Sequence, residues 1–353
     1  MFRDEARAFL ESKFPAERVV ELADSGRGWD PTTYKEMAEL GWVGLSSPAS
    51  AGGSGMTFLE EAVLFEELGR ALFVGPFFST VGPCLPALEA APDLLARTVA
   101  GEVVVAPAWA EPSGPQTLYE TSGFTTKASD DDEGGWTIMG EKILVPDAGI
   151  ASHFVVAADT GEGPGLFAAE GTGSVSSTVD ATRALGTVAF AGGPAELLAG
   201  PADFGPLLER IRLRAHAALA LEAVGVGDAA LAMAVQHATT RTQFDRPVGA
   251  YQAVSHQIAD AYVDVELARS LAYWAAWCVA EFDPQAPQAV AAAKSFAAGA
   301  TVRACERSIQ VHGGIGFTWE HMLHRYYKRA LWIEAFDGFG SAHRAQVAAS
   351  LLD

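Results

Sequence analysis

The sequence has little positive charge. Lysine and arginine together number 24, against 44 aspartates and glutamates, and the formal net charge is −20 over 353 residues. Nucleic acids and anionic membrane surfaces repel so acidic a chain, and we expect neither as a partner. An anionic small ligand would need a local group of arginines and lysines.

Cysteine is scarce, and long apolar runs are missing. Cys84, Cys278 and Cys305 are widely spaced and fit neither a disulfide framework nor a metal site, which favours a reducing, cytoplasmic compartment. No unbroken apolar run of about 18 residues occurs, and the acidic N-terminus does not fit a signal peptide. These absences predict a protein without a membrane span.

What is present fits a well-buried globular protein. Hydrophobic residues make up 49% of the chain and charged residues 19%, and the length predicts two or three domains. The periodicity changes along the chain and predicts an α+β, mostly α protein. We expect an N-terminal helical domain over 1–100, a middle β domain over 101–205 and a C-terminal helical bundle over 206–353.

Local signals support this order. Asp30–Pro31 predicts a helix start, and Thr57 with Glu60 predicts a capping box before a second amphipathic helix. Strands are predicted at "VVVAPAWA", "GWTIMGEKILV", "HFVVAA" and "GLFAA", and "KASDDDEGGW" predicts an acidic hairpin loop. Three long helices, expected to pack between subunits, are predicted over 207–244, 250–282 and 288–314.

The stretch "QVHGGIGF", Gln310–Phe317, interrupts this helical region. Its glycines Gly313, Gly314 and Gly316 each cost about 1 kcal/mol in a helix relative to alanine. They either end one helix and turn the chain into the next, or they offer a backbone without side chains to a large, flat ligand.

Several motifs, taken in order, carry a resemblance to a known family. They are "LGWVGLSSPASAGGSGM", "EELGRAL", "WTIMGEK", "RTQFDRPVGAYQAVSHQIAD" and "QVHGGIGFTWEHMLHRYYKRA". Together they resemble the acyl-CoA dehydrogenases over essentially the whole chain. The "FTWEH" variant looks most like the short subunits of heteromeric actinobacterial enzymes that act on steroid side chains or similar bulky acyl groups.

The resemblance implies a fold and a reaction. The acyl-CoA dehydrogenase fold has an N-terminal helical domain, a middle β-barrel-like domain and a C-terminal four-helix bundle. The family removes two hydrogens from the Cα and Cβ of an acyl-CoA thioester, in lipid metabolism. FAD is the implied cofactor, and electron-transfer flavoprotein is the implied electron acceptor.

One half of a flavin site is present by resemblance. An R-x-x-F-(x7)-Q pattern reaches the FAD that is bound mainly by a neighbouring subunit, and its positions are Arg241, Phe244 and Gln252. A guanidinium suits a pyrophosphate, a ring can pack on adenine, and an amide can bond ribityl or phosphate oxygens. Gln310 and the Gly313–Gly314 backbone complete this surface. From the residues alone, Arg241 could equally be a surface arginine at a helix start.

The motifs that hold the flavin ring are altered. The family's T-E-P-x-x-G-S-D reads "AEPSGPQT", and its G-x-K-x-W-I-T-N reads "GEKILVPD". Glu111 and Lys142 survive, but flavin-facing positions have become Ala110, Leu144 and Pro146. Each missing donor would leave part of the flavin's polar edge unpaired, at about 1–3 kcal/mol. We therefore expect the β domain to hold no flavin of its own.

The catalytic base is altered as well. The family's Glu-Gly-Thr reads Asp337-Gly338-Phe339. The reaction needs a carboxylate with a raised pKa to take the α-proton, and Asp337, one methylene shorter than glutamate, is the candidate. Some relatives place the glutamate near the start of the long helix, where Ala215 and His216 stand in this sequence.

Three functions stay open on the sequence. The preferred interpretation is the partner that completes the FAD site of a heteromeric complex with a second acyl-CoA dehydrogenase subunit. The alternatives are a competent homomeric dehydrogenase that uses Asp337, and a non-redox acyl-CoA binder or scaffold. The histidines near the glycines, His312, His321 and His324, lack metal-ligand spacing, and we expect them to be core or interface residues.

Overall fold

The computed structural model describes residues 1–26, 28–130 and 135–352. The chain forms two compact units, each assembled from segments that are separate in sequence. Unit 1 comprises Met1–Glu21, Glu61–Phe73 and His216–Asp353, and unit 2 comprises Leu22–Glu60 and Val74–Ala215. The three domain boundaries drawn from the sequence stay a prediction.

The N-terminal helices begin where the capping signals predict. The Asp30 side chain accepts a hydrogen bond from the Thr32 N–H (3.0 Å) and caps the third helix. The Thr57 N–H donates to Glu60 Oε2 (2.9 Å), which confirms the capping box. The helices are α1 (Phe2–Lys13), α2 (Ala16–Asp24), α3 (Pro31–Glu39) and α4 (Phe58–Arg70).

A short helical region leads from α4 to the strands of unit 2. It comprises α5 (Phe77–Ser79), a π-helical turn (Thr80–Cys84), α6 (Leu85–Leu88) and α7 (Pro92–Val99). The Thr80 hydroxyl donates to Val105 O (2.9 Å) and so ties this buried region to the first strand.

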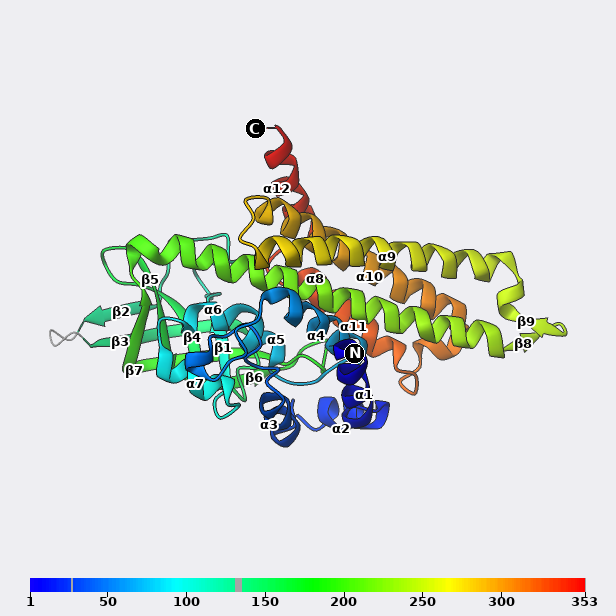
Figure 1. Cartoon of the computed structure of the whole chain (residues 1–353), viewed down its shortest axis with the longest axis horizontal. Helices are drawn as coiled ribbons and strands as arrows, with labels where there is room; N and C mark the ends of the chain where they lie inside the picture. The colour runs from blue at the N-terminus through cyan, green and yellow to red at the C-terminus, as the bar shows by residue number, and fades with distance from the viewer. Residues whose placement is uncertain (27, 131–134, 353) are drawn as a thin grey trace. The chain divides into compact units, whose positions relative to one another are not determined.

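Seven strands of unit 2 form one barrel-like sheet (Figure 1). Neighbouring strands follow the order β1-β4-β2-β3-β7-β5, β6 pairs with β7, and a further pairing of β4 with β5 closes the path. Buried apolar side chains, among them Phe154, Phe167 and Phe190, form its core. The strands are β1 (Val105–Ala108), β2 (Lys127–Asp130), β3 (Trp136–Pro146), β4 (His153–Asp159), β5 (Pro164–Glu170), β6 (Thr172–Ser176) and β7 (Leu185–Ala199).

The four predicted strand runs all contain strands, and β2 and β3 form the predicted hairpin, with Asp130 opposite Trp136. The centre of the predicted acidic loop, residues 131–134, lies outside the described residues. Sequence reasoning missed β6 and β7. The glycines and alanines of β7 have low strand propensity, and its extended form depends on pairing with β3, β5 and β6.

The three predicted long helices are confirmed, but residues 241–244, predicted as the end of the first, lie outside it, and Thr242–Gln243 form a short strand. In unit 1 the later part of α8 lies beside α9 and α10 (Figure 1). A side-chain carbon added at Gly227 of α8 would lie 3.1 Å from Val265 and 3.2 Å from Thr301, so the helices pack closely at this glycine. The C-terminal helices are α8 (Pro201–Thr240), α9 (Gln252–Ala280), α10 (Ala286–His312), α11 (Leu323–Ala335) and α12 (Gly340–Leu352).

Among the described residues, α8 is the one helix long and apolar enough, by length and composition, to cross a membrane. Its most apolar 18-residue window has a mean hydropathy of 1.7, and 78% of that window is buried inside the protein. A core helix of a bundle has these properties, and α8 has that position.

Candidate functional site

The two altered flavin motifs lie next to each other in unit 2. "AEPSGPQT", residues 110–117, follows β1, and "GEKILVPD" forms the end of β3 and the residue after it. The Ile143 N–H donates to Ala110 O (2.8 Å), so the backbone joins the two motifs directly.

Glu111 and Lys142, the surviving side chains of these motifs, bond each other. Lys142 Nζ lies 2.6 Å from Glu111 Oε1, and both side chains are fully buried. Glu111 also accepts hydrogen bonds from the Thr125 hydroxyl (2.6 Å) and the Thr126 N–H (3.1 Å). Burial alone would raise the pKa of Glu111, but the bonds from Lys142 and Thr125 outweigh it and lower that pKa to about 2. This ion pair holds the two motifs together.

The other flavin-facing positions of these two motifs do not fit a flavin. Ala110 and Pro146 are buried and carry no side-chain donor, and Leu144 is 54% exposed with a φ of 54°. The N–H groups of Gln116 and Thr117 donate to Glu120 Oε2 at 2.6 and 3.0 Å. These two N–H groups thus bond a carboxylate of this chain, whose negative charge would repel a phosphate at the same place.

Arg241, Phe244 and Gln252 lie in unit 1 on the connection from α8 to α9. Arg241 directly follows α8, and Gln252 is the first residue of α9; both are exposed. Phe244 is at the tip of a small hairpin between β8 (Thr242–Gln243) and β9 (Arg246–Pro247), with 87% of its surface exposed. An aromatic side chain this exposed is available to a second molecule.

The three glycines after α10 differ in what the structure requires of them. Gly313 has a φ of 65° and ends α10, which confirms a helix stop at this residue. Gly316 is buried, and a side-chain carbon added to it would lie 2.8 Å from Ile309 O. Gly314 has no positive φ, and an added carbon would meet nothing within 4 Å. In the described chain, therefore, nothing requires glycine at 314, and its open surface leaves room for an external ligand next to the exposed Gln310.

Histidine side chains bring the two predicted segments together. The rings of His237 on α8 and His312 on α10 lie 4.4 Å apart. His237 is one turn before Arg241, with its carbonyl oxygen accepting from the Arg241 N–H (2.9 Å), and His312 directly precedes Gly313. The turn that carries Arg241 and the turn that carries Gln310–Gly314 are therefore neighbours in unit 1.

Asp337, the candidate base, bonds a histidine. Its Oδ2 lies 2.6 Å from His216 Nε2, and each side chain is 1% exposed. Burial lowers the pKa of the nearby Lys294 to about 8, against the raising effect of Asp337. Asp337 thus bonds a residue of the region, Ala215–His216, where the resemblance places the base of some relatives. Sequence reasoning did not pair them, because no local pattern links residues 121 positions apart.

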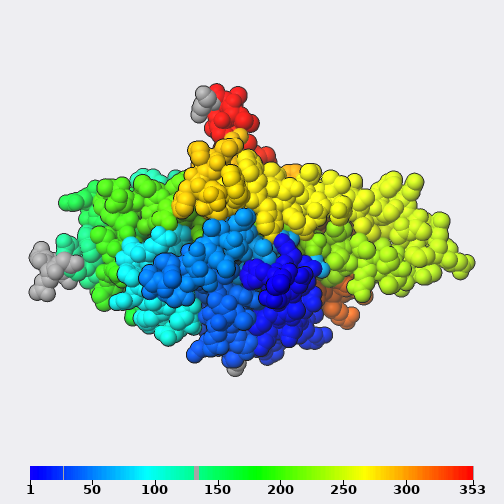
Figure 2. All heavy atoms as spheres, in the orientation of Figure 1, coloured from blue at the N-terminus to red at the C-terminus, as the bar shows by residue number. Residues whose placement is uncertain are grey.

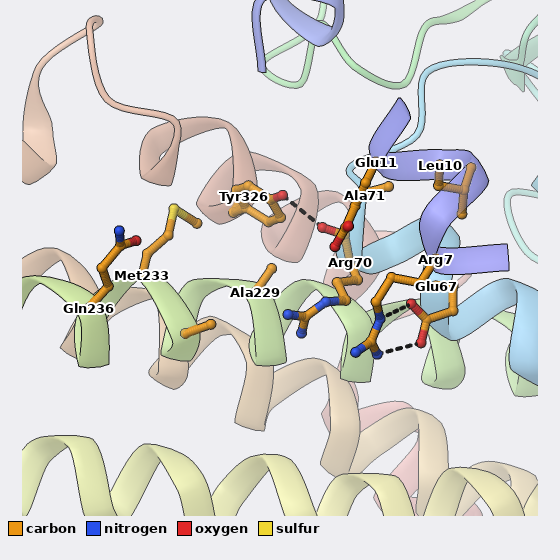
Figure 3. A pocket seen from close by; sticks show the side chains of 11 residues that line it. Arg7, Leu10, Glu11, Glu67, Arg70, Ala71, Ala229, Met233, Gln236 and Tyr326 are labelled. Atoms are coloured by element: carbon orange, nitrogen blue, oxygen red, sulfur yellow. Dashed lines mark hydrogen bonds and ion pairs between the residues drawn. The ribbon is translucent and has the colours of Figure 1, made fainter. Parts of the chain in front are cut away.

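A cavity of about 260 Å³ lies elsewhere in unit 1 (Figure 3). Three of its charged lining residues are paired: Arg7 donates two hydrogen bonds of 2.8 Å to Glu67, and Arg70 pairs with Asp228. The Tyr326 hydroxyl donates to Arg70 O (2.8 Å). None of the sequence-predicted site residues lines this cavity.

Two family models match the chain. One describes the N-terminal domain of acyl-CoA dehydrogenases and matches residues 1–89, and the other describes their C-terminal domain and matches residues 213–352. Acyl-CoA dehydrogenase FadE27 of Mycobacterium tuberculosis is 30% identical over 342 residues, which cover 88% of this chain and 85% of the relative. The chain belongs to the acyl-CoA dehydrogenase family.

Solved structures of this family agree with the assignment. The chain is similar to a Tcur3481-Tcur3483 steroid ACAD variant, with a TM-score of 0.85 and 29% identity over 99% of this chain and 96% of that one. It is also similar to the ChsE4-ChsE5 complex from Mycobacterium tuberculosis, with a TM-score of 0.87 and 25% identity over 100% and 96%. The predicted acyl-CoA dehydrogenase fold and the resemblance to steroid-type members are both confirmed.

Proposed function

We propose that this chain is the flavin-poor subunit of a heteromeric acyl-CoA dehydrogenase. A second subunit of the same family would hold FAD in its own β domain. This chain would contribute a surface made of Arg241, Phe244, Gln252 and Gln310–Gly314 to the distal part of that cofactor. When bound, FAD accepts the hydride that leaves Cβ of the acyl-CoA thioester.

The observation that carries the proposal is the pairing of Glu111 with Lys142. These two residues survive, with Pro112 and Gly140, in motifs whose flavin-facing positions have changed, and their side chains bond each other in the interior. Residues whose side chains stabilise the fold are retained in such a motif, while positions that only contacted a ligand can change without loss of stability. Ala110, Leu144 and Pro146 follow this pattern.

Residues of unit 1 support the proposed contact with the FAD of the partner subunit. Arg241 places a permanent positive charge on an acidic chain, where a pyrophosphate could accept paired hydrogen bonds. Phe244 and Gly314 are open to a second molecule. The competing interpretation of a homomeric enzyme is disfavoured because the Asp337 carboxylate is engaged by His216 in the interior.

The proposal also covers the acyl group, the assembly of subunits and the electron acceptor. Similarity to a steroid ACAD and to the ChsE4-ChsE5 complex supports a bulky, steroid-type acyl group and a complex of two kinds of subunit. We propose a heterotetramer, and the scarcity of cysteine favours the cytoplasm as its location. Helix α9 lies at the surface (Figure 2) and exposes large apolar side chains that suit a subunit contact: Tyr262, Val263, Leu267 and Trp277. Electron-transfer flavoprotein would take the electrons from the assembled enzyme.

Flavin content provides the test. We expect the chain alone to show little flavin absorbance after desalting, and the complex with its partner to be yellow. In the complex, Arg241→Ala should weaken FAD binding about tenfold to a hundredfold, since a charge-assisted bond contributes roughly 1.5–3 kcal/mol. Arg210→Ala is the matched control, because Arg210 pairs with Glu89 on the surface of unit 2. A stoichiometric flavin in the isolated chain, or full flavin in the Arg241→Ala complex, would contradict the proposal.

A further inference from the structure

Three histidine rings form a row in unit 1, with His312 between His237 (4.4 Å) and His321 (4.6 Å). His312 Nδ1 lies 2.8 Å from Ser308 O, and because a carbonyl oxygen only accepts, this nitrogen carries the proton. His321 Nδ1 accepts from the Leu323 N–H (3.2 Å), so the proton of the neutral ring is on Nε2. Hydrogen bonds thus select one neutral tautomer for each of these two rings.

The surroundings of the row favour the neutral forms of His237 and His321. Burial, followed by the influence of His312, lowers the pKa of both His237 and His321. Arg241 also acts on His237, and both His237 and His324 act on His321. No carboxylate of the described chain is among these groups. A metal does not explain the row, since no group of three or more potential ligands among the described residues could hold one.

We propose that this histidine row is a positioning device for the cofactor surface. In its neutral form it holds the turn of Arg241 against the turn of Gln310–Gly314, and protonation in acid separates them. The inference rests on the proposed function, because it assigns the row to the surface that contacts the partner's FAD.

Protonation acts through specific contacts. An imidazolium ring donates at both nitrogens, so a protonated His321 no longer accepts from the Leu323 N–H. Leu323 begins α11, and a positive charge at a helix N-terminus opposes the helix dipole. Charging neighbouring rings in the row also places like charges 4.4–4.6 Å apart, next to Arg241.

The direction of the pH effect follows from the lowered pKa values. The folded row holds His237 and His321 neutral below 6.5, their ordinary pKa, whereas the separated histidines take up protons there. The stabilising effect of the row is therefore complete above that pH and is lost as the pH falls through and below it. In acid, each unit by which the folded row lowers the pKa of a histidine reduces the ratio of assembled to separated row about tenfold.

The experiment measures the FAD affinity of the complex at pH values of about 7.5 and about 5.5, on either side of the histidine range. We expect the native complex to bind FAD more weakly at the lower pH, reversibly, by about tenfold for each unit by which the folded row lowers the pKa of its histidines. His312→Phe keeps a ring between its neighbours but removes the like charge that lowers their pKa after burial, so its affinity should change less with pH than that of the native complex. His153→Phe, at a histidine of β4 in unit 2, should behave like the native complex.

The outcomes separate this inference from the proposed function. If Arg241→Ala keeps its full FAD affinity, the proposed function itself fails. If Arg241→Ala loses FAD while His312→Phe and the native complex respond equally to pH, only the histidine row fails. Should His312→Phe not fold, histidine proton resonances of the native complex decide: titration of His237 and His321 below the ordinary pKa supports the row, and titration at or above it overturns the inference.

Discussion

His216 and Asp337 show how one contact changes the chemistry available to a residue. A general base must reach the proton that it removes, on a substrate that enters from outside. The Asp337 carboxylate instead lies 2.6 Å from His216 Nε2, with both side chains 1% exposed. The His216 ring also packs edge-on against His343 of α12, with ring centroids 4.9 Å apart. These contacts assign Asp337 to the structure of the α11–α12 connection.

Asp337→Asn is therefore expected to lower stability and to leave turnover of the heteromeric enzyme nearly unchanged. An amide weakens the bond to His216, and a perturbed buried hydrogen bond costs about 1–3 kcal/mol. Thermal unfolding and acyl-CoA oxidation with an artificial electron acceptor measure the two effects. His216→Gln is the companion variant, and the double variant should be less destabilised than the sum of the two. Loss of turnover with unchanged stability would instead identify Asp337 as the base.

Among the elements, the sheet of unit 2 shows why part of a ligand motif persists. Lys142 on β3 bonds Glu111 in the loop after β1, and it also donates to Trp109 O (3.2 Å). The same Nζ lies 4.9 Å from the centre of the Phe124 ring. Three segments of the β domain thus meet at one lysine, and burial lowers the pKa of that lysine to about 8.

Lys142→Met should destabilise the chain strongly, because removing one partner of a buried ion pair leaves the other charge uncompensated, at about 3–5 kcal/mol. Lys127→Met is the matched control on the neighbouring strand β2, where Lys127 is 58% exposed and bonds Asp159 at 2.6 Å. That surface pair contributes at most about 1 kcal/mol. Chemical denaturation compares the two variants, and equal effects would contradict the structural role of the Glu111–Lys142 pair.

For the molecule as a whole, acidity and exposed apolar side chains point to assembly with other protein subunits. The net charge of −20 argues against nucleic acids and anionic membrane surfaces as partners. Four large apolar residues on α9 nevertheless have 44% to 57% of their surface exposed: Tyr262, Val263, Leu267 and Trp277. Burial of such side chains between subunits stabilises a complex by the hydrophobic effect.

We expect the native protein to sediment as a dimer or tetramer, without a stable monomer of 37.1 kDa at micromolar concentration. Leu267→Glu places a charge in the expected contact, costing on the order of 3 kcal/mol if it is buried unpaired, and should shift the protein toward the monomer. Leu144→Glu, at a leucine of similar exposure in unit 2, should not. A folded native monomer would count against assembly through α9.

Features that depend on neighbouring residues could be predicted from the sequence. The Asp30 cap, the Thr57–Glu60 box and the long helices arise from local hydrogen bonds and short-range periodicity. The family motifs were equally readable, because their residues occur at short spacings within each motif.

Features that depend on residues far apart required the folded chain. Glu111 is 31 positions from Lys142, and His216 is 121 from Asp337, so no local pattern marks either pair. Their protonation and roles follow from shared burial, which makes an unpaired charge costly. The His237–His312 contact likewise exists only because α8 and α10 end side by side. Spacing along the chain thus selects the fold and the family, and burial in the folded state decides which polar residues bond each other and which remain open to a partner.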